Sequence, residues 1–351
     1  MKQFRTTFIR AGLGALYFSG AHYLLRPIFA GAGAVFMLHH VRPPRADDFQ
    51  PNRHLEVTPG FLRATLAHLK SRDIDIVTMD EVHHRLSNRK FERRFAAFTF
   101  DDGYRDNRDH ALAVMREFAA PFTVFVASDF AEGTGRLWWV ALERTIAKAS
   151  RIEVTMGGHA TRFDTTTTAG KQAAFDRVHD WLRGLQEHDL AREIGALCAR
   201  HGVDMAAICR DLCMSWDELK GFADDPLVSI GAHTITHCNL AQQREDVARE
   251  ELTVSRARIE EKLQRAVLHL CYPYGDRRAA GQREFALASS AGYKTAVTTR
   301  PGMVFPESAG HLTALPRVSL NGNYQDARVL PVLTSGAATA MYNGFRRVDP
   351  A

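Results

Sequence analysis

The sequence predicts an α/β protein built as a (β/α) barrel, either complete or incomplete. Short apolar runs rich in β-branched and aromatic residues alternate with stretches of helical periodicity. This alternation is typical of a parallel sheet with crossover helices. Acidic residues and histidines also follow the ends of several runs, where a parallel barrel gathers its active residues. An open doubly wound sheet is the alternative architecture.

Eight apolar runs have the length and composition of buried strands. Such runs are short, and polar or turn-forming residues bound them. Seven or eight parallel strands suit a closed barrel. We expect strands at residues 34–38, 75–79, 96–100, 122–127, 227–231, 267–272 and 293–299, and a weaker one at 314–320.

Helical patterns lie between several of these runs. Thr58 suits the N-cap of one helix and Pro59 its first turn, and leucines then repeat on one face. Two further helices are expected within residues 106–119 and over about residues 243–265.

Residues 131–226 interrupt the alternation, because they contain no good strand pattern and several helical ones. We interpret them as a helical insertion within a barrel of residues 34–320. Such an insertion commonly covers or shapes a site. Trp138 and Trp139 at its start could stack on a sugar, but we interpret them as helix core.

Residues 1–33 form a basic and then apolar N-terminal segment, and residues 321–351 a C-terminal tail or helix. The N-terminal stretch imitates a signal peptide, with "AGA" at 30–32 as a cleavage site, which leaves export open. Arg26 and Pro27 interrupt it, so it falls short of a spanning helix. We favour a retained helix that packs on the domain, with peripheral membrane contact as the alternative.

Charge and cysteine content exclude two classes of protein. The formal net charge is only +5, and the basic residues are scattered among acids, so no nucleic-acid partner is expected. Five cysteines without a CxxC pair argue against a disulfide framework. We therefore expect a reducing compartment, the cytoplasm, with membrane association left open.

Histidines and acids recur after the predicted strands. The spacing of His233 and His237 lets one helical turn direct both side chains at one ion. Asp102 adds an oxygen ligand from another strand, and such a set leaves positions open for water and substrate. Capping the next helix would need only one acid of the pair. The residues are His39 and His40 after 34–38, Asp101 and Asp102 after 96–100, and His233 and His237 after 227–231.

Three motifs in this order resemble the polysaccharide deacetylase family, also called the NodB-homology domain or carbohydrate esterase family 4. They are "TFDDG" at 99–103, "HTITH" at 233–237 and "YPYG" at 272–275. The resemblance covers most of residues 34–320 and implies a distorted (β/α) barrel. It also implies a hydrolase that removes N-acetyl groups from an amino sugar in a polysaccharide, such as an exopolysaccharide, or in an oligosaccharide.

The resemblance assigns roles residue by residue. Asp102, His233 and His237 would bind one divalent metal ion, which we expect to be Zn²⁺. Asp101 would be the general base, and the backbone N–H of Tyr274 would stabilise the oxyanion. Arg105 would either pair with Asp101 or lie on the surface.

The general acid that protonates the leaving amine departs from the family pattern. The Leu-x-His motif of many members is missing, and Cys271 replaces the Arg that often precedes the Pro-Tyr pair. A bacterial subgroup carries a His near its start in a segment like Tyr-His-x-Val. "MLHHV" at 37–41 resembles that segment, which assigns the acid to His39, with His40 as the fallback.

Two alternatives to a glycan N-deacetylase stay open at this point. One is a deacylase or deformylase of a lipid-linked sugar, or of a small amide, at the cytoplasmic face of a membrane. The apolar N-terminal segment motivates it. The other is a catalytically inactive glycan-binding relative, which the missing His and Arg motivate.

Overall fold

A closed ring of seven parallel strands forms the centre of the computed structural model, which describes residues 2–347, with side chains from residue 6 onward. β1 pairs with both β12 and β5, which closes the ring and excludes an open doubly wound sheet. The predicted barrel is therefore confirmed. Around the ring run β1 (Gly33–Leu38), β5 (Phe95–Phe100), β6 (Phe122–Val126), β9 (Val228–Ala232), β10 (His269–Cys271), β11 (Thr295–Pro301) and β12 (Leu315–Ser319).

All eight predicted strands are present, but the second of them lies outside the ring. β4 (Asp75–Val77) pairs with residues 95–97 of β5, while β6 pairs with residues 98–100 of the same strand. β4 and β6 thus share one edge of β5, and only β6 continues around the barrel. The barrel is therefore distorted, as the family resemblance implies.

Helices cover the outside of the ring. Thr58 caps α3 by accepting a hydrogen bond from the N–H of Phe61 at 3.1 Å, and Pro59 is its first residue, as predicted. The bounds are α3 (Pro59–Ser71), α4 (Met79–Ser87), α5 (Leu112–Glu117) after a π-helical turn at Asn107–Ala111, α12 (Glu245–Leu263) and α13 (Gln282–Ser290). A short parallel pair, β2 (His40–Val41) and β3 (Glu56–Val57), lies beside β1, and single 3₁₀ segments are Arg53–Leu55, Leu240–Gln242 and Pro306–Ala314.

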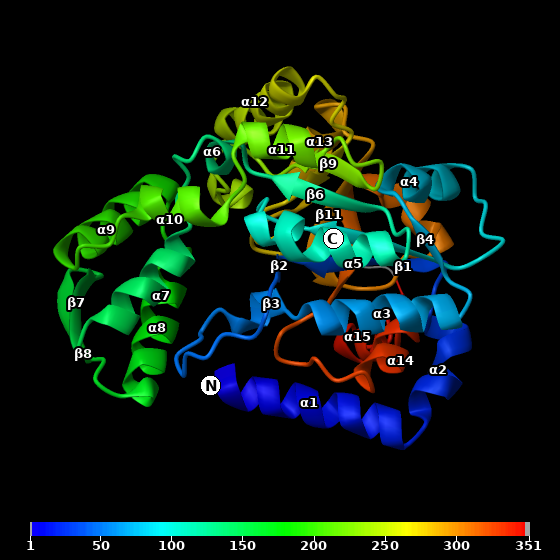
Figure 1. Ribbon diagram of the computed structural model, residues 1–351, viewed down its shortest axis with the longest axis horizontal. Helices are drawn as coiled ribbons and strands as arrows, with labels where there is room; N and C mark the ends of the chain where they lie inside the picture. Colours follow the sequence, from blue (N-terminus) through cyan, green and yellow to red (C-terminus); the bar gives the residue numbers. More distant parts are fainter. Residues whose placement is uncertain (1, 348–351) are drawn as a thin grey trace.

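The segment between β6 and β9 projects from one side of the barrel (Figure 1). It has its own hydrophobic cluster, which includes Trp138 and Trp139. Both tryptophans are buried, in agreement with their interpretation as core. The helices are α6 (Ser128–Ala131), α7 (Trp138–Lys148), α8 (Thr168–Arg183), α9 (Glu187–Arg200), α10 (Met205–Leu212) and α11 (Trp216–Phe222).

The expectation that residues 131–226 contain no strand is wrong. β7 (Arg151–Met156) and β8 (His159–Asp164) form an antiparallel hairpin. Gly157 and Gly158 both have positive φ in its two-residue turn, the conformation that hairpins favour. Ile152 and Val154 are buried between exposed neighbours, so the alternation and the Gly-Gly pair were the available signal.

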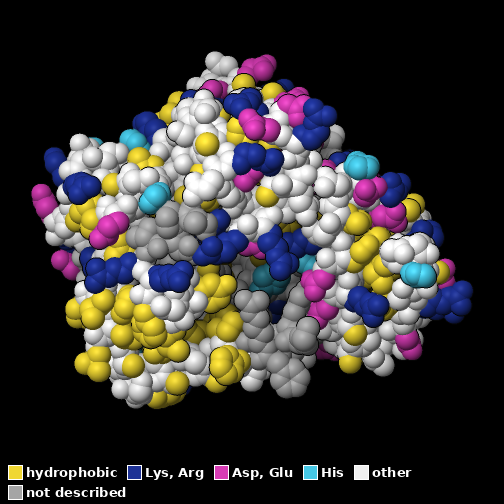
Figure 2. All heavy atoms as spheres, turned by 180° about the vertical axis from the view of Figure 1, so that it is seen from behind, with side chains coloured by type: hydrophobic (Ala, Val, Ile, Leu, Met, Phe, Trp, Pro, Cys, Tyr) yellow, Lys and Arg dark blue, Asp and Glu magenta, His cyan; other side chains and the backbone are white. Residues whose placement is uncertain are grey.

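The N-terminal segment forms two helices, α1 (Lys2–Phe18) and α2 (Ala21–Phe29), which pack on the C-terminal α14 (Val329–Thr334) and α15 (Ala337–Tyr342). Leu13 and Leu16 are buried against Val332 and Ala337. Among the described residues, no helix combines the length and apolarity that crossing a bilayer requires. Figure 2 shows hydrophobic side chains gathered at the corner formed by these helices.

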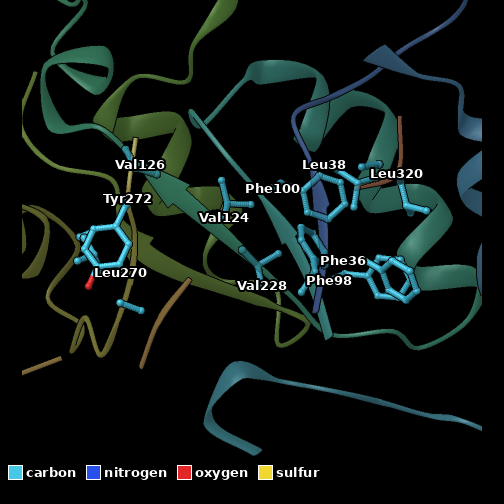
Figure 3. Close-up of a cluster of buried hydrophobic side chains, with 14 of the residues drawn as sticks. Phe36, Leu38, Phe98, Phe100, Val124, Val126, Val228, Leu270, Tyr272 and Leu320 are labelled. Carbon is cyan, nitrogen blue, oxygen red and sulfur yellow. The ribbon is translucent and has the colours of Figure 1, made fainter. Parts of the chain in front are cut away.

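The barrel strands are buried on both faces, which explains why they read as continuous apolar runs. Successive residues of a strand belong alternately to one of two hydrophobic clusters. Phe36 and Phe98, with ring centroids 5.3 Å apart, join the cluster shared with the covering helices (Figure 3). Val35 and Ala97 join the other cluster, which links several strands to one another and to Val82 of α4. This packing on both faces of the ring holds the C-terminal ends of the strands in fixed positions.

Candidate active site

The predicted site residues converge at the C-terminal end of the barrel. Asp101 and Asp102 follow β5, His233 follows β9, and Pro273 and Tyr274 follow β10. Because the strands are parallel, these loops leave the ring on the same side. Asp101, Asp102 and His233 are each about 2% exposed, so the cluster is closed off from bulk water.

Asp102, His233 and His237 have the spacing of ligands to one metal ion. Oδ1 of Asp102 lies 3.4 Å from Nε2 of His233 and 3.3 Å from Nε2 of His237. A tetrahedral Zn²⁺ with bonds of about 2.0–2.1 Å keeps its ligand atoms about 3.3–3.4 Å apart. The same Oδ1 is buried and accepts no hydrogen bond from any residue that the structure describes. The three side chains therefore fit a divalent ion.

The hydrogen bond behind His233 fixes which nitrogen faces Asp102. Nδ1 of His233 lies 2.7 Å from the backbone oxygen of Cys271, which can only accept, so Nδ1 carries the hydrogen. Nε2 of the neutral imidazole then directs a lone pair at the carboxylate, an arrangement that a shared cation makes favourable.

The described residues contain a second group of ligand type, Asp101, His233 and Cys271, which is not available for an ion. Both carboxylate oxygens of Asp101 accept hydrogen bonds from Arg317 at 2.7 Å. Nη2 of Arg317 also lies 3.1 Å from the sulfur of Cys271. The guanidinium thus occupies the position in which this group would hold a cation.

Two residues of the "HTITH" loop and two others of the site have a left-handed backbone. Asp102, Thr234, His237 and Tyr274 have φ of 72°, 66°, 62° and 60°, and they are four of nine such non-glycine residues in the described chain. Each costs about 1–3 kcal/mol and persists only where its surroundings enforce it. The predicted helical turn at 233–237 is therefore wrong: a bend with two left-handed residues brings the imidazoles together.

Glu251 of α12 holds this bend in place. Its Oε2 accepts the N–H groups of Ile235 and Thr236 at 2.7 and 3.0 Å, and its Oε1 accepts the hydroxyl of Thr236 at 2.8 Å. Within the bend, the hydroxyl of Thr234 accepts the N–H of His237 at 3.1 Å. These bonds offset the backbone strain and fix the positions of the two imidazoles.

Arg317 is a site residue that the sequence did not reveal. It belongs to β12, is fully buried, and reaches Asp101 with a two-pronged ion pair. Burial would raise the pKa of Asp101, but the charge of Arg317 holds it below its usual value. The alternative that Arg105 pairs with Asp101 is wrong, because Arg105 pairs with Glu218 at 2.8 Å.

The structure separates the two adjacent histidines. Nε2 of His39 lies 3.7 Å from Oδ2 of Asp101, and the side chain is 18% exposed at the edge of the site. His40 is buried instead, with Nδ1 2.6 Å from Asp106 and its ring stacked on Tyr104. Only His39 is therefore placed to reach a molecule bound beside Asp101.

Tyr274 and the two tryptophans form a wall of the site. The ring of Tyr274 lies 5.1 Å from that of His237, and its hydroxyl accepts the indole N–H of Trp138 at 2.8 Å. The ring of Trp139 lies 4.9 Å from that of His237. The backbone N–H of Tyr274 has no hydrogen-bond acceptor among the described residues, so it is available to a ligand.

Comparisons with known proteins agree with this geometry. A family model described as polysaccharide deacetylase matches residues 88–296, more than half of the chain. No curated protein sequence matches. Among solved structures, the Streptococcus pyogenes deacetylase PplD in complex with acetate is similar, with a TM-score of 0.56 and 17% identity over 83% of this chain and 92% of that chain.

Two further solved structures have the same fold. IcaB from Ammonifex degensii gives a TM-score of 0.50 and 18% identity, covering 82% of this chain and 91% of that chain. BC0361, a polysaccharide deacetylase from Bacillus cereus, gives 0.52 and 16% identity, covering 85% of this chain and 68% of that chain.

Proposed function

Since the chain belongs to the polysaccharide deacetylase family, we propose that it removes N-acetyl groups from an N-acetylated amino sugar by metal-dependent hydrolysis. One observation carries the proposal: a buried Asp102, His233 and His237 triad stands beside a second carboxylate that an arginine holds ionised. Two acids with separate partners suit separate roles, one as ligand and one as base.

Each residue has a place in such a reaction. Asp102, His233 and His237 would hold the ion, which we propose to be Zn²⁺, and a bound ion would polarise the acyl carbonyl and activate water. Asp101 accepts the proton of the attacking water, since Arg317 keeps it ionised. The free N–H of Tyr274 donates a hydrogen bond to the carbonyl oxygen as it becomes negative.

His39 is proposed to give the leaving amine its proton. We expect His39→Gln to lower kcat on an N-acetylated sugar by about 10²–10³-fold, since a positioned acid contributes about that much. Hydrolysis of p-nitrophenyl acetate should fall far less, because its phenolate leaves without a proton. Steady-state kinetics on both substrates measures the difference.

His40→Gln is the matched control for this variant. It removes the contact with Asp106 and should therefore lower the unfolding temperature. Its kcat should change little, because His40 does not reach the site. An equal loss on both substrates in His39→Gln would contradict the acid role.

Arg317 is proposed as a positioning residue for the base. In Arg317→Met, Asp101 stays buried without its counter-charge, so its pKa should rise and the acidic limb of the kcat profile should move to higher pH. Breaking such a buried pair also costs about 3–5 kcal/mol of stability. Arg317→Lys keeps the positive charge and should reverse part of this rise in the pKa of Asp101. A pH profile with an unmoved acidic limb would rule the positioning role out.

Acetate release coupled to metal analysis tests the function as a whole. We expect about one divalent ion per chain and acetate release from at least one member of a panel of N-acetylated oligosaccharides. Tight glycan binding without acetate release, in protein that holds its ion, would indicate the glycan-binding alternative. The intact base and ligand set argue against that alternative.

A second candidate keeps the chemistry and changes the substrate to a lipid-linked sugar at the cytoplasmic face of a membrane. The exposed apolar side chains of α1 and α2 favour it, and five cysteines without a disulfide agree with a reducing compartment. Adding a lipid-linked N-acetylated sugar to the panel separates the two candidates.

A further inference from the structure

Exposed hydrophobic side chains are concentrated on one surface. Of the eleven large hydrophobic residues that are exposed in the described chain, nine lie in α1, in α2, or in and just after α15. Phe8 and Leu24 are each 80% exposed and Phe18 is 74% exposed. Figure 2 shows this apolar corner as a continuous area, with Arg and Lys side chains along its border. An area of this kind marks an interaction site.

α1 is apolar on both of its sides. Leu13 and Leu16 face inward and are buried against α14 and α15. Phe8, Ala11, Ala15 and Phe18 recur at helical spacing on the outer side, and all four are exposed. A helix that is hydrophobic all round is normally covered on both sides, so its outer side lacks a partner.

The surroundings of this surface are basic. The sequence has no Asp or Glu before Asp47. Arg26, Arg94 and Arg347 line a groove beside α2 together with a single acid, Glu307. None of these three arginines forms an ion pair with a carboxylate in the part of the chain that the structure describes.

A second groove beside α2, which shares Arg26 and Arg94 with the first, is also basic. It is lined by Arg26, Arg72 and Arg94, with His68 beside them. Burial, Arg72 and Arg26 together lower the pKa of His68. The region is thus positive, with Glu307 as the single acid that lines the two grooves, and it complements an anionic surface.

We propose that α1, α2 and α15 dock the protein on an anionic lipid bilayer, with the apolar side chains in the acyl boundary and the arginines at the phosphates. A helix with an exposed apolar face and flanking cations binds membranes in this way. A second copy fits less well, because a two-fold contact places the same surface against itself and would bring the uncompensated arginines together. The proposal does not depend on the enzymatic activity.

Vesicle flotation of the full chain tests this docking. We expect binding to vesicles of phosphatidylcholine and phosphatidylglycerol in equal parts, weaker binding to phosphatidylcholine alone, and weakening by salt. Phe18→Glu with Leu24→Glu should lower the partition coefficient by about tenfold for each side chain. Both residues are exposed, so the variant should fold, and its hydrolysis of a water-soluble substrate should be unchanged.

Val247→Glu with Val254→Glu is the matched control, because these α12 residues are the exposed large hydrophobics outside the apolar corner. The control should bind vesicles like the unchanged protein. Equal binding by the Phe18 and Leu24 variant, or no binding by the unchanged protein, would overturn the proposal. So would light scattering that shows a dimer which this variant dissociates, since the surface would then be covered by a second copy.

Discussion

Asp101→Asn is expected to lower kcat on an N-acetylated sugar by about 10²–10⁴-fold, the contribution of a positioned general base. The amide cannot take the proton of the attacking water, although it keeps the shape of the side chain. The three ligand residues are untouched, so metal content should equal that of the unchanged protein. Turnover and metal content measured on the same preparation check both parts.

Loss of folding must be separated from loss of the base in this variant. Asn leaves the buried guanidinium of Arg317 without its carboxylate partner, which costs about 3–5 kcal/mol. Pairing Asp101→Asn with Arg317→Met removes both charges and should recover stability without recovering kcat. Full activity in Asp101→Asn would refute the base assignment, and recovery of kcat in the pair would show that the loss was structural.

The candidate site was predictable where neighbouring residues in the sequence share a strand end. Asp101 and Asp102 directly follow a run that reads as a buried strand, and His233 follows another. In a parallel barrel the C-terminal ends of the strands meet on one side. The positions of these residues in the sequence therefore predict that they lie close together. Arg317, the partner of Asp101, was not predicted, because the sequence does not indicate to which face of a strand a single Arg points.

Adjacent positions show the same limit. His39 and His40 are chemically identical in the sequence, but neighbouring residues of an extended chain point to opposite sides. One therefore reaches Asp101 and the other packs on Tyr104. The hairpin of β7 and β8 was missed for a different reason, since helical patterns on either side dominated a short alternation.

The fold was predictable from the alternation of strands and helices, whereas the choice of the strands that form the ring was not. β5 contacts β1 along its whole length and divides its other edge between β4 and β6. Which strand continues the ring depends on these registers. The sequence pattern of β4 resembles that of the ring strands, so composition could not place it outside.

Removing the metal is expected to abolish acetate release, by about 10³-fold or more, because the ion polarises the carbonyl and activates the water. Treatment with a chelator followed by Zn²⁺ should restore it. An ion that binds only the folded state also stabilises that state, so Zn²⁺ should raise the unfolding temperature of the metal-free protein. Thermal unfolding with and without Zn²⁺ reads out binding independently of turnover.

His237→Ala distinguishes a ligand from a base by the same two measurements. It removes one of three ligands and should lose both metal content and the rise in unfolding temperature, whereas Asp101→Asn should lose neither. The loss of metal binding should exceed what a change in side-chain packing alone would cause. No hydrogen-bond donor among the described residues can take the place of the ion at Oδ1 of Asp102. Chelated protein that retains full activity, or a His237→Ala variant that still takes up Zn²⁺ with its thermal shift, would contradict the metal site. Asp101→Asn and His237→Ala therefore make opposite predictions for metal content, which this pair of variants measures.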